Sequence, residues 1–191
     1  ELIPSGDTSS YRSNPEKLSS FALSRKDPNY VGEAKAEREN ERRRRAGEHV
    51  EALDGVYAAI GAENPDDIML ASVVLAERPG DGSAREQAAS CQRVLGGVAN
   101  IALEYATKRY RSNLINWGML PFTKKSDIPA KVGDYIYIDG IREAVANGKT
   151  EVAASVVSGG TLTPCTLYLE NLTDEDRQIL LDGCLINYYK R

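Results

Sequence analysis

The chain alternates between segments with the two-residue period of strands and segments with the three- to four-residue period of helices. Residues 68–76 form an apolar run interrupted only by Ser72, which is typical of a strand covered on both faces, and we expect this strand to be central in its sheet. Further strands are predicted at residues 99–103, 134–138, 151–157 and 161–169. Two glycines between the last two strands indicate a hairpin.

Helices are predicted in five segments, at residues 16–23, 33–60, 83–95, 106–117 and 173–189. Gly61 follows the second segment and Gly96 the third, in the position where a glycine commonly ends a helix. Thr173 precedes three acidic residues and fits the N-cap of the last helix. Because strands and helices alternate, the sequence predicts an α/β domain.

The 191 residues are enough to form one domain with its own core. We divide them into an entry segment at 1–32, rich in loop-forming proline, glycine and serine, a helical segment at 33–62 and a core at 63–191. The chain begins with Glu1 instead of Met, and its first residues have neither the charged nor the apolar region of a signal peptide. We therefore expect a fragment of a longer chain.

Composition argues against several classes of protein. Apolar runs fall well short of the ~20 residues that a membrane helix needs, so we expect no membrane span and a cytoplasmic location. The three cysteines, Cys91, Cys165 and Cys184, cannot all pair and have no C-x-x-C spacing, which argues against a disulfide framework and a zinc site. The only histidine, His49, has no partner at metal-ligand spacing. We predict no metal ligands in this chain.

Two basic clusters, Arg42–Arg45 and Lys108–Arg111, raise the question of nucleic-acid binding. Acidic residues precede the first cluster, and ion pairs four residues apart are predicted for Glu39 with Arg43 and for Glu41 with Arg45. The chain has 24 Lys and Arg against 28 Asp and Glu, a net charge of -4, whereas nucleic-acid-binding domains usually carry a basic excess. We therefore predict a solvated helix face and no nucleic-acid partner.

The strongest candidate for chemistry is the turn from Gly80 to Glu86, between a predicted strand and a predicted helix. Its two glycines allow a sharp bend that points successive N–H groups at one place, where negative charge is stabilised. Arg85 adds a planar set of donors suited to a carboxylate. Ser83 places an oxygen where positive potential would stabilise an alkoxide. The same Ser83 and Glu86 also fit a capping box, S-x-x-E, and the spacing alone favours that interpretation.

Arg12 is the second candidate, in a loop of small polar residues at 9–15. An isolated arginine in a loop is usually solvated. Residue type alone therefore gives Arg12 no function.

Several of these motifs together resemble the C-terminal swivelling domain of the aconitase superfamily. The turn at 80–86 resembles the family's G-x-G-S-S-R-E-H turn, and it is followed by a helix and by a Leu-Gly-Gly step at 95–97. Residues 113–121 resemble the family's N-L-x-x-x-G-x-L-P segment, and residues 2–6 resemble the start of that domain. The resemblance covers nearly the whole chain, is weakest at 34–62, and is closest to the aconitate hydratase domain proteins.

The resemblance implies a three-layer swivelling β/β/α domain with a mixed sheet and flanking helices. It also implies dehydration and rehydration of a hydroxy di- or tricarboxylic acid, whose hydroxyl leaves onto an iron of a [4Fe-4S] cluster. Carried over by position, Ser83 is the catalytic base that removes the carbon-bound proton, and Arg85 and Arg12 bind substrate carboxylates. Ala84 takes the substrate-binding position of a second serine. The family's cluster ligands are cysteines of its N-terminal domains, so we do not expect them in this chain.

Three arrangements remain open. The leading prediction is the substrate-binding and base domain of an aconitate hydratase-like hydro-lyase, inactive alone, with its cluster-bearing N-terminal domains in the same chain. The second is a separate small subunit, as in isopropylmalate isomerases, that assembles with a cluster-bearing subunit. The third is a relative that binds RNA, which the net charge disfavours.

Overall fold

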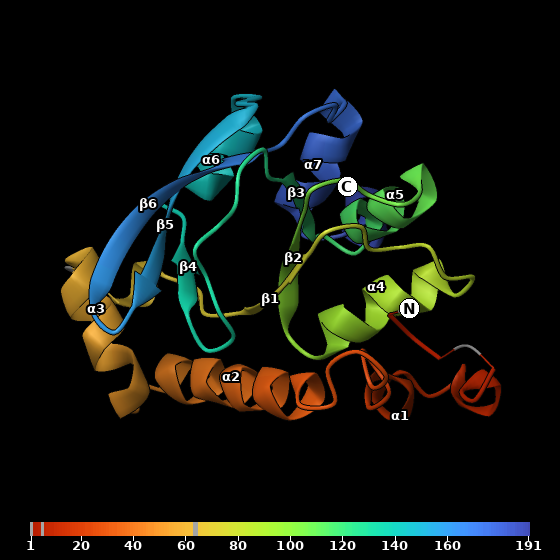
Figure 1. Ribbon diagram of the computed structural model, residues 1–191. Helices are drawn as coiled ribbons and strands as arrows, with labels where there is room; N and C mark the ends of the chain where they lie inside the picture. The colour runs from red at the N-terminus through yellow and green to blue at the C-terminus, as the bar shows by residue number, and fades with distance from the viewer. Residues whose placement is uncertain (1, 5, 63–64) are drawn as a thin grey trace.

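A computed structural model describes residues 2–4, 6–62 and 65–191 of the protein. Within these residues, six strands form one mixed sheet in the order β1-β2-β3-β6-β5-β4 (Figure 1). The strands are β1 (Ser72–Ala76), β2 (Gly97–Ala102), β3 (Leu120–Thr123), β4 (Tyr135–Tyr137), β5 (Glu151–Ser158) and β6 (Thr161–Tyr168). The predicted mixed sheet is confirmed, and β3 is a strand that the sequence pattern did not predict.

The sheet consists of a parallel half and an antiparallel half. Strands β1, β2 and β3 are parallel, and β6, β5 and β4 are antiparallel to their neighbours. The two halves are joined through β3 and β6, with Thr123 opposite Tyr168. The predicted glycine hairpin is confirmed, because Ser158 pairs with Thr161 across Gly159 and Gly160.

Helices cover both faces of the sheet. They are α1 (Pro15–Ser19), α2 (Tyr30–Arg45), α3 (Asp54–Ile60), α4 (Arg85–Val94), α5 (Lys108–Asn116), α6 (Ile141–Ala146), α7 (Asp174–Asp182) and α8 (Leu185–Tyr188), with short 3-10 helices η1 (Ser9–Tyr11), η2 (Glu51–Leu53) and η3 (Pro65–Asp67). Val73 and Val74 point to opposite faces of β1 and join two different apolar clusters. One cluster draws on α6, α7 and the antiparallel strands, and the other on α1, α2 and α4. The domain therefore has three layers.

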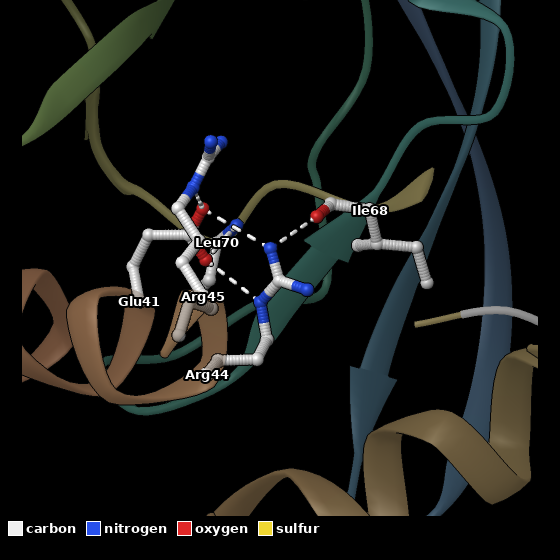
Figure 2. A network of polar contacts seen from close by, with 5 residues as sticks. All are labelled: Glu41, Arg44, Arg45, Ile68 and Leu70. Carbon is white, nitrogen blue, oxygen red and sulfur yellow. Dashed lines mark hydrogen bonds and ion pairs between the residues drawn. The ribbon is translucent and has the colours of Figure 1, made fainter. Parts of the chain in front are cut away.

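The prediction that residues 68–76 form a central strand is wrong. The regular strand is only Ser72–Ala76, and β1 lies at the edge of the sheet. The preceding residues are held by side chains of α2 instead of by a neighbouring strand (Figure 2). Arg44 donates to the carbonyl of Ile68 at 2.5 Å, and the N–H of Leu70 donates to Glu41 Oε2 at 3.2 Å. Because a buried backbone group needs a partner of some kind, these side chains replace the missing strand.

Two long helices predicted from periodicity are interrupted in the structure. The segment 33–60 contains most of α2, a break at Gly47, and then η2 and α3. The last helix breaks at Gly183, whose φ of 89° ends α7 before α8 begins. Periodicity continues across both breaks, whereas the backbone follows the glycines. Gly61 ends α3 in the left-handed conformation, as predicted.

The ion pairs of α2 differ in part from the predicted ones. Glu41 pairs with Arg45 as expected, but Glu39 pairs with Arg42 and not with Arg43. Arg44 is not solvated: only 7% of its side chain is exposed, and it pairs with Glu41 at 2.8 Å. The predicted fully solvated face is therefore wrong at this arginine, which turns inward to reach the segment before β1.

Candidate functional site

The glycine turn after β1 lies at the edge of the sheet where the three parallel strands end. Parallel strands present their carboxyl ends on one side, and ligands of open α/β sheets bind there. The backbone ties the loops after β1 and β2 together, because the N–H groups of Leu103 and Glu104 both donate to the carbonyl of Glu77 at 3.1 Å. The turn containing Ser83 is thus held beside the loop that follows β2.

Ser83 lies one residue before the N-cap of the helix that follows it. The N-cap of α4 is Ala84, which makes no side-chain hydrogen bond to the helix, and Arg85 is the first helical residue. Glu86 instead accepts a hydrogen bond from Trp117 Nε1 at 2.5 Å. The predicted capping box required Ser83 to be the N-cap, whereas α4 has Ala84 in that position, and the Glu86 side chain reaches the residue that ends α5.

Arg85 is the first residue of α4 and carries a buried guanidinium nitrogen. It is half-buried, and its Nε is buried with no hydrogen-bond partner among the described residues. Most buried polar atoms in proteins are paired, so an unpaired guanidinium nitrogen at a helix N-terminus indicates a place for an acceptor from outside the domain. A small hollow adjoins it and is lined by Leu2, Ile3, Gly80, Gly82, Ala84, Arg85 and Ala88.

The entry segment contributes to this hollow in a way that sequence reasoning missed. Ile3 is buried, and the carbonyl of Leu2 accepts a hydrogen bond from the N–H of Leu23 at 2.8 Å. The hydrogen bond joins two parts of the entry segment, and Ile3 belongs to the same apolar cluster as Ala88 of α4. The apolar character of Leu2 and Ile3 among loop-forming residues was the signal available in the sequence.

The structure groups three of the four predicted site residues. Ser83, Ala84 and Arg85 are consecutive, and Ser83 is exposed to solvent. Arg12 is exposed at the end of η1 and is not among the residues that line the hollow. The structure therefore supports a common location for the turn residues and does not bring Arg12 into it.

In the second basic cluster, Lys108–Arg111, one arginine makes hydrogen bonds within the domain. Arg111 donates to the carbonyls of Glu170 at 2.5 Å and of Asn171 at 3.4 Å, which ties α5 to the segment before α7. Nearby, the buried Lys124 amine is 2.6 Å from Glu77 Oε1. These cations already have anionic or carbonyl partners within the domain.

The three cysteines do not form a site for an iron-sulfur cluster. Cys91 is buried in α4, Cys165 lies in β6 and Cys184 precedes α8. Burial raises the pKa of Cys91 to about 12, which keeps this thiol protonated. In the parts of the chain that the structure covers, no group of three or more His, Cys, Asp or Glu residues could hold a metal ion. The residues present therefore do not fit a cluster.

Among the described residues, no helix is both long enough and apolar enough to cross a membrane.

Three comparisons relate the chain to known proteins. A model of the aconitase C-terminal domain family matches residues 33–127, a range that includes the glycine turn, α4 and α5. The chain is 32% identical over 136 residues to a protein of Methanocaldococcus jannaschii named methanogen homoaconitase small subunit. The aligned region covers 70% of this chain and 71% of that protein. The crystal structure of 3-isopropylmalate dehydratase from the same organism superposes with a TM-score of 0.59, at 24% identity, over 99% of this chain and 83% of that one. The structural match confirms the predicted fold class.

Proposed function

The chain belongs to the aconitase C-terminal domain family, and from this premise we propose that it binds the substrate and transfers the proton in an aconitase-like hydro-lyase. The two relatives are named as a homoaconitase small subunit and a 3-isopropylmalate dehydratase, and both names describe enzymes of this type. The observation that carries the proposal is the unpaired Arg85 nitrogen beside an exposed Ser83 at the start of α4.

The substrate class is a hydroxy di- or tricarboxylic acid. Arg85 binds one carboxylate through its planar donors, assisted by the positive end of the α4 dipole. Arg12 is proposed to bind a second carboxylate, which requires the entry segment to approach the turn when substrate is present. Ala84 contributes its backbone N–H and no hydroxyl to the substrate.

Ser83 is proposed as the base that takes the carbon-bound proton of the substrate onto its Oγ. A serine hydroxyl is a weak base, so the reactive form is the alkoxide, and its charge must be balanced. The positive end of α4 and the nearby Arg85 guanidinium favour that charged form. The exposed position of Ser83 allows substrate to reach it from outside the domain.

We place the [4Fe-4S] cluster outside this chain, on a cluster-bearing partner that supplies the site for the departing hydroxyl. The cysteines within this chain do not fit that group. The partner is either a set of N-terminal domains in the same polypeptide or a separate large subunit. The name of the homoaconitase relative, a small subunit, favours the second arrangement.

The test is an activity assay of the Ser83→Ala variant in the anaerobically reconstituted complex with the cluster-bearing partner. Citrate, isocitrate, homocitrate and isopropylmalate are the substrates to compare. Because general-base catalysis contributes about 100- to 10,000-fold, we expect kcat to fall by that factor with KM nearly unchanged. The matched control is Ser112→Ala, which removes an exposed hydroxyl that donates to the carbonyl of Lys108 in its own helix. Full activity of Ser83→Ala would show that another group takes the proton.

A further inference from the structure

We propose that Thr107 and Tyr110 of α5 are positioning residues that hold the Gly80–Ser83 turn in its working geometry. This inference rests on the proposed function, because it assigns a role to residues that act through Ser83. Neither residue lines the hollow at the turn. We refer to Ala106, Thr107 and Tyr110 together as the α5 clamp.

The clamp first fixes the backbone that enters the turn. The N–H of Ala106 donates to the carbonyl of Pro79 at 3.0 Å, and Thr107 Oγ1 donates to the carbonyl of Gly80 at 3.1 Å. Two consecutive carbonyls are thereby held by two consecutive residues of another loop. The Pro79–Gly80 and Gly80–Asp81 peptide planes, at the start of the turn, cannot rotate without breaking one of these hydrogen bonds.

The clamp also contacts the turn directly, through the side chain of Tyr110. Gly80 has a φ of 98°, and a Cβ built on it would lie 2.5 Å from Tyr110 Cγ and 2.6 Å from Tyr110 Cβ. The backbone of the turn therefore rests on the side chain of Tyr110, at a distance that only glycine permits.

A closed set of hydrogen bonds fixes the Tyr110 ring. Its hydroxyl donates to Asn100 Oδ1 at 2.7 Å and accepts from Gln92 Nε2 at 2.8 Å, while Asn100 Nδ2 donates to Gln92 Oε1 at 2.6 Å. All three side chains are buried. Burial raises the pKa of Tyr110 far above its ordinary value of 10.0, so the phenol remains a donor at every physiological pH. A fully satisfied buried network of this kind specifies one position for its members.

The hydroxyl of Thr107 has two functions that substitutions can separate. It donates to Gly80, and it accepts from the N–H of Tyr110 at 3.2 Å as the N-cap of α5. Aspartate is a good N-cap but, when ionised, has no proton to donate to a carbonyl. Glycine is also tolerated as an N-cap and carries no charge. Serine keeps both functions.

The experiment compares Thr107→Asp, Thr107→Gly and Thr107→Ser in the reconstituted complex. We expect kcat to fall about 10- to 100-fold in the aspartate and glycine variants, with KM nearly unchanged. The reason is that Ser83 Oγ would no longer be held in the position from which it reaches the substrate proton. Thr107→Ser should restore wild-type kcat. Independently of activity, amide hydrogen exchange of residues 80–84 should accelerate in the first two variants, while exchange in α5 beyond its first turn stays as in the wild type.

Several outcomes would overturn the clamp. Wild-type exchange at residues 80–84 together with wild-type kcat in Thr107→Gly would show that Thr107 only caps α5. A loss of kcat in Thr107→Asp that is absent in Thr107→Gly would assign the effect to the added charge. Failure of the proposed function is distinct: there Ser83→Ala keeps full activity, and the exchange measurements still decide whether Thr107 holds the turn.

Discussion

The parallel and antiparallel halves of the sheet are built from the same kinds of residue but by different connections. In the antiparallel half, Ser158 pairs with Thr161 across two glycines, and the whole register of β5 and β6 follows from that hairpin. In the parallel half, each strand returns only after a helix, so β1, β2 and β3 end at one edge. The candidate site lies at that edge of the parallel half.

The difference shows where polar side chains stabilise this fold. The hairpin is closed by its own backbone and packs on an apolar cluster. In the parallel half, side chains bond to the backbone on either side of β1. The α5 clamp contacts Gly80 after the strand, and Glu41 and Arg44 bond to the segment before it. Long-range connections bring separate loops together, and these side chains fix how the loops meet. The predictions below test whether the parallel half depends on such contacts more than the hairpin does.

The largest effect on stability is expected from Arg44→Met. The substitution keeps the apolar stem but leaves the Ile68 carbonyl without its donor and Glu41 without one partner. Breaking a buried ion pair by removing one member costs about 3 kcal/mol or more. Urea denaturation should show this loss in the free energy of unfolding.

Arg42→Met is the matched control for that experiment. Arg42 lies two positions earlier on α2 and pairs with Glu39, but 65% of its side chain is exposed. Exposed pairs contribute about 0–1 kcal/mol, so this variant should unfold nearly as the wild type does. Equal losses for the two variants would mean that the contacts of Arg44 with the segment before β1 do not add to the free energy of unfolding.

Gly80→Ala should follow in size. The methyl group would meet Tyr110, and the φ of 98° disfavours any side chain, so we expect a loss of about 2–3 kcal/mol in the free energy of unfolding. Gly82→Ala is the comparison, because a Cβ there meets no atom within 4 Å and φ is not positive. A variant at Gly80 as stable as one at Gly82 would contradict the packing of the turn on Tyr110.

The sequence predicted elements whose geometry is local and failed where distant groups decide. The hairpin, Gly61 and the Thr173 cap, which forms a capping box with Asp176, are confirmed because each is determined within a few residues. The position of β1 was wrong because an apolar run does not reveal which side chains will cover its edge. Similarly, the motif identified Ser83 and Arg85 as site candidates, whereas the support from Thr107 and Tyr110 depends on a contact across more than 25 residues.

Val156→Ala tests the antiparallel half. Val156 is 1% exposed in β5, and removing two buried methyl-sized groups should cost about 2 kcal/mol in the free energy of unfolding. Since the hairpin is remote from the proposed chemistry, kcat and KM of the reconstituted complex should not change below the unfolding temperature. Val132→Ala, at a 73% exposed position, should change neither quantity. A fall in kcat for Val156→Ala would show that the two halves are coupled.

The smallest effect is the pH dependence that Glu41 gives to the parallel half. Burial acts to raise the pKa of Glu41, but hydrogen bonds from Arg44, Arg45 and the Leu70 N–H outweigh it and hold this pKa below its ordinary value of 4.5. A carboxylate whose pKa is lower in the folded state stabilises the fold fully above its unfolded pKa, and this contribution is lost as the pH falls through the folded pKa. The contribution of Glu41 to the free energy of unfolding should therefore be constant above pH 4.5 and decrease below it.

Urea denaturation between pH 6 and pH 3 tests this expectation. The free energy of unfolding should decrease less steeply for Glu41→Gln than for the wild type, whereas Glu39→Gln, at an exposed position, should follow the wild type more closely. Parallel curves for Glu41→Gln and the wild type would mean that the ionised carboxylate does not stabilise the edge of the sheet.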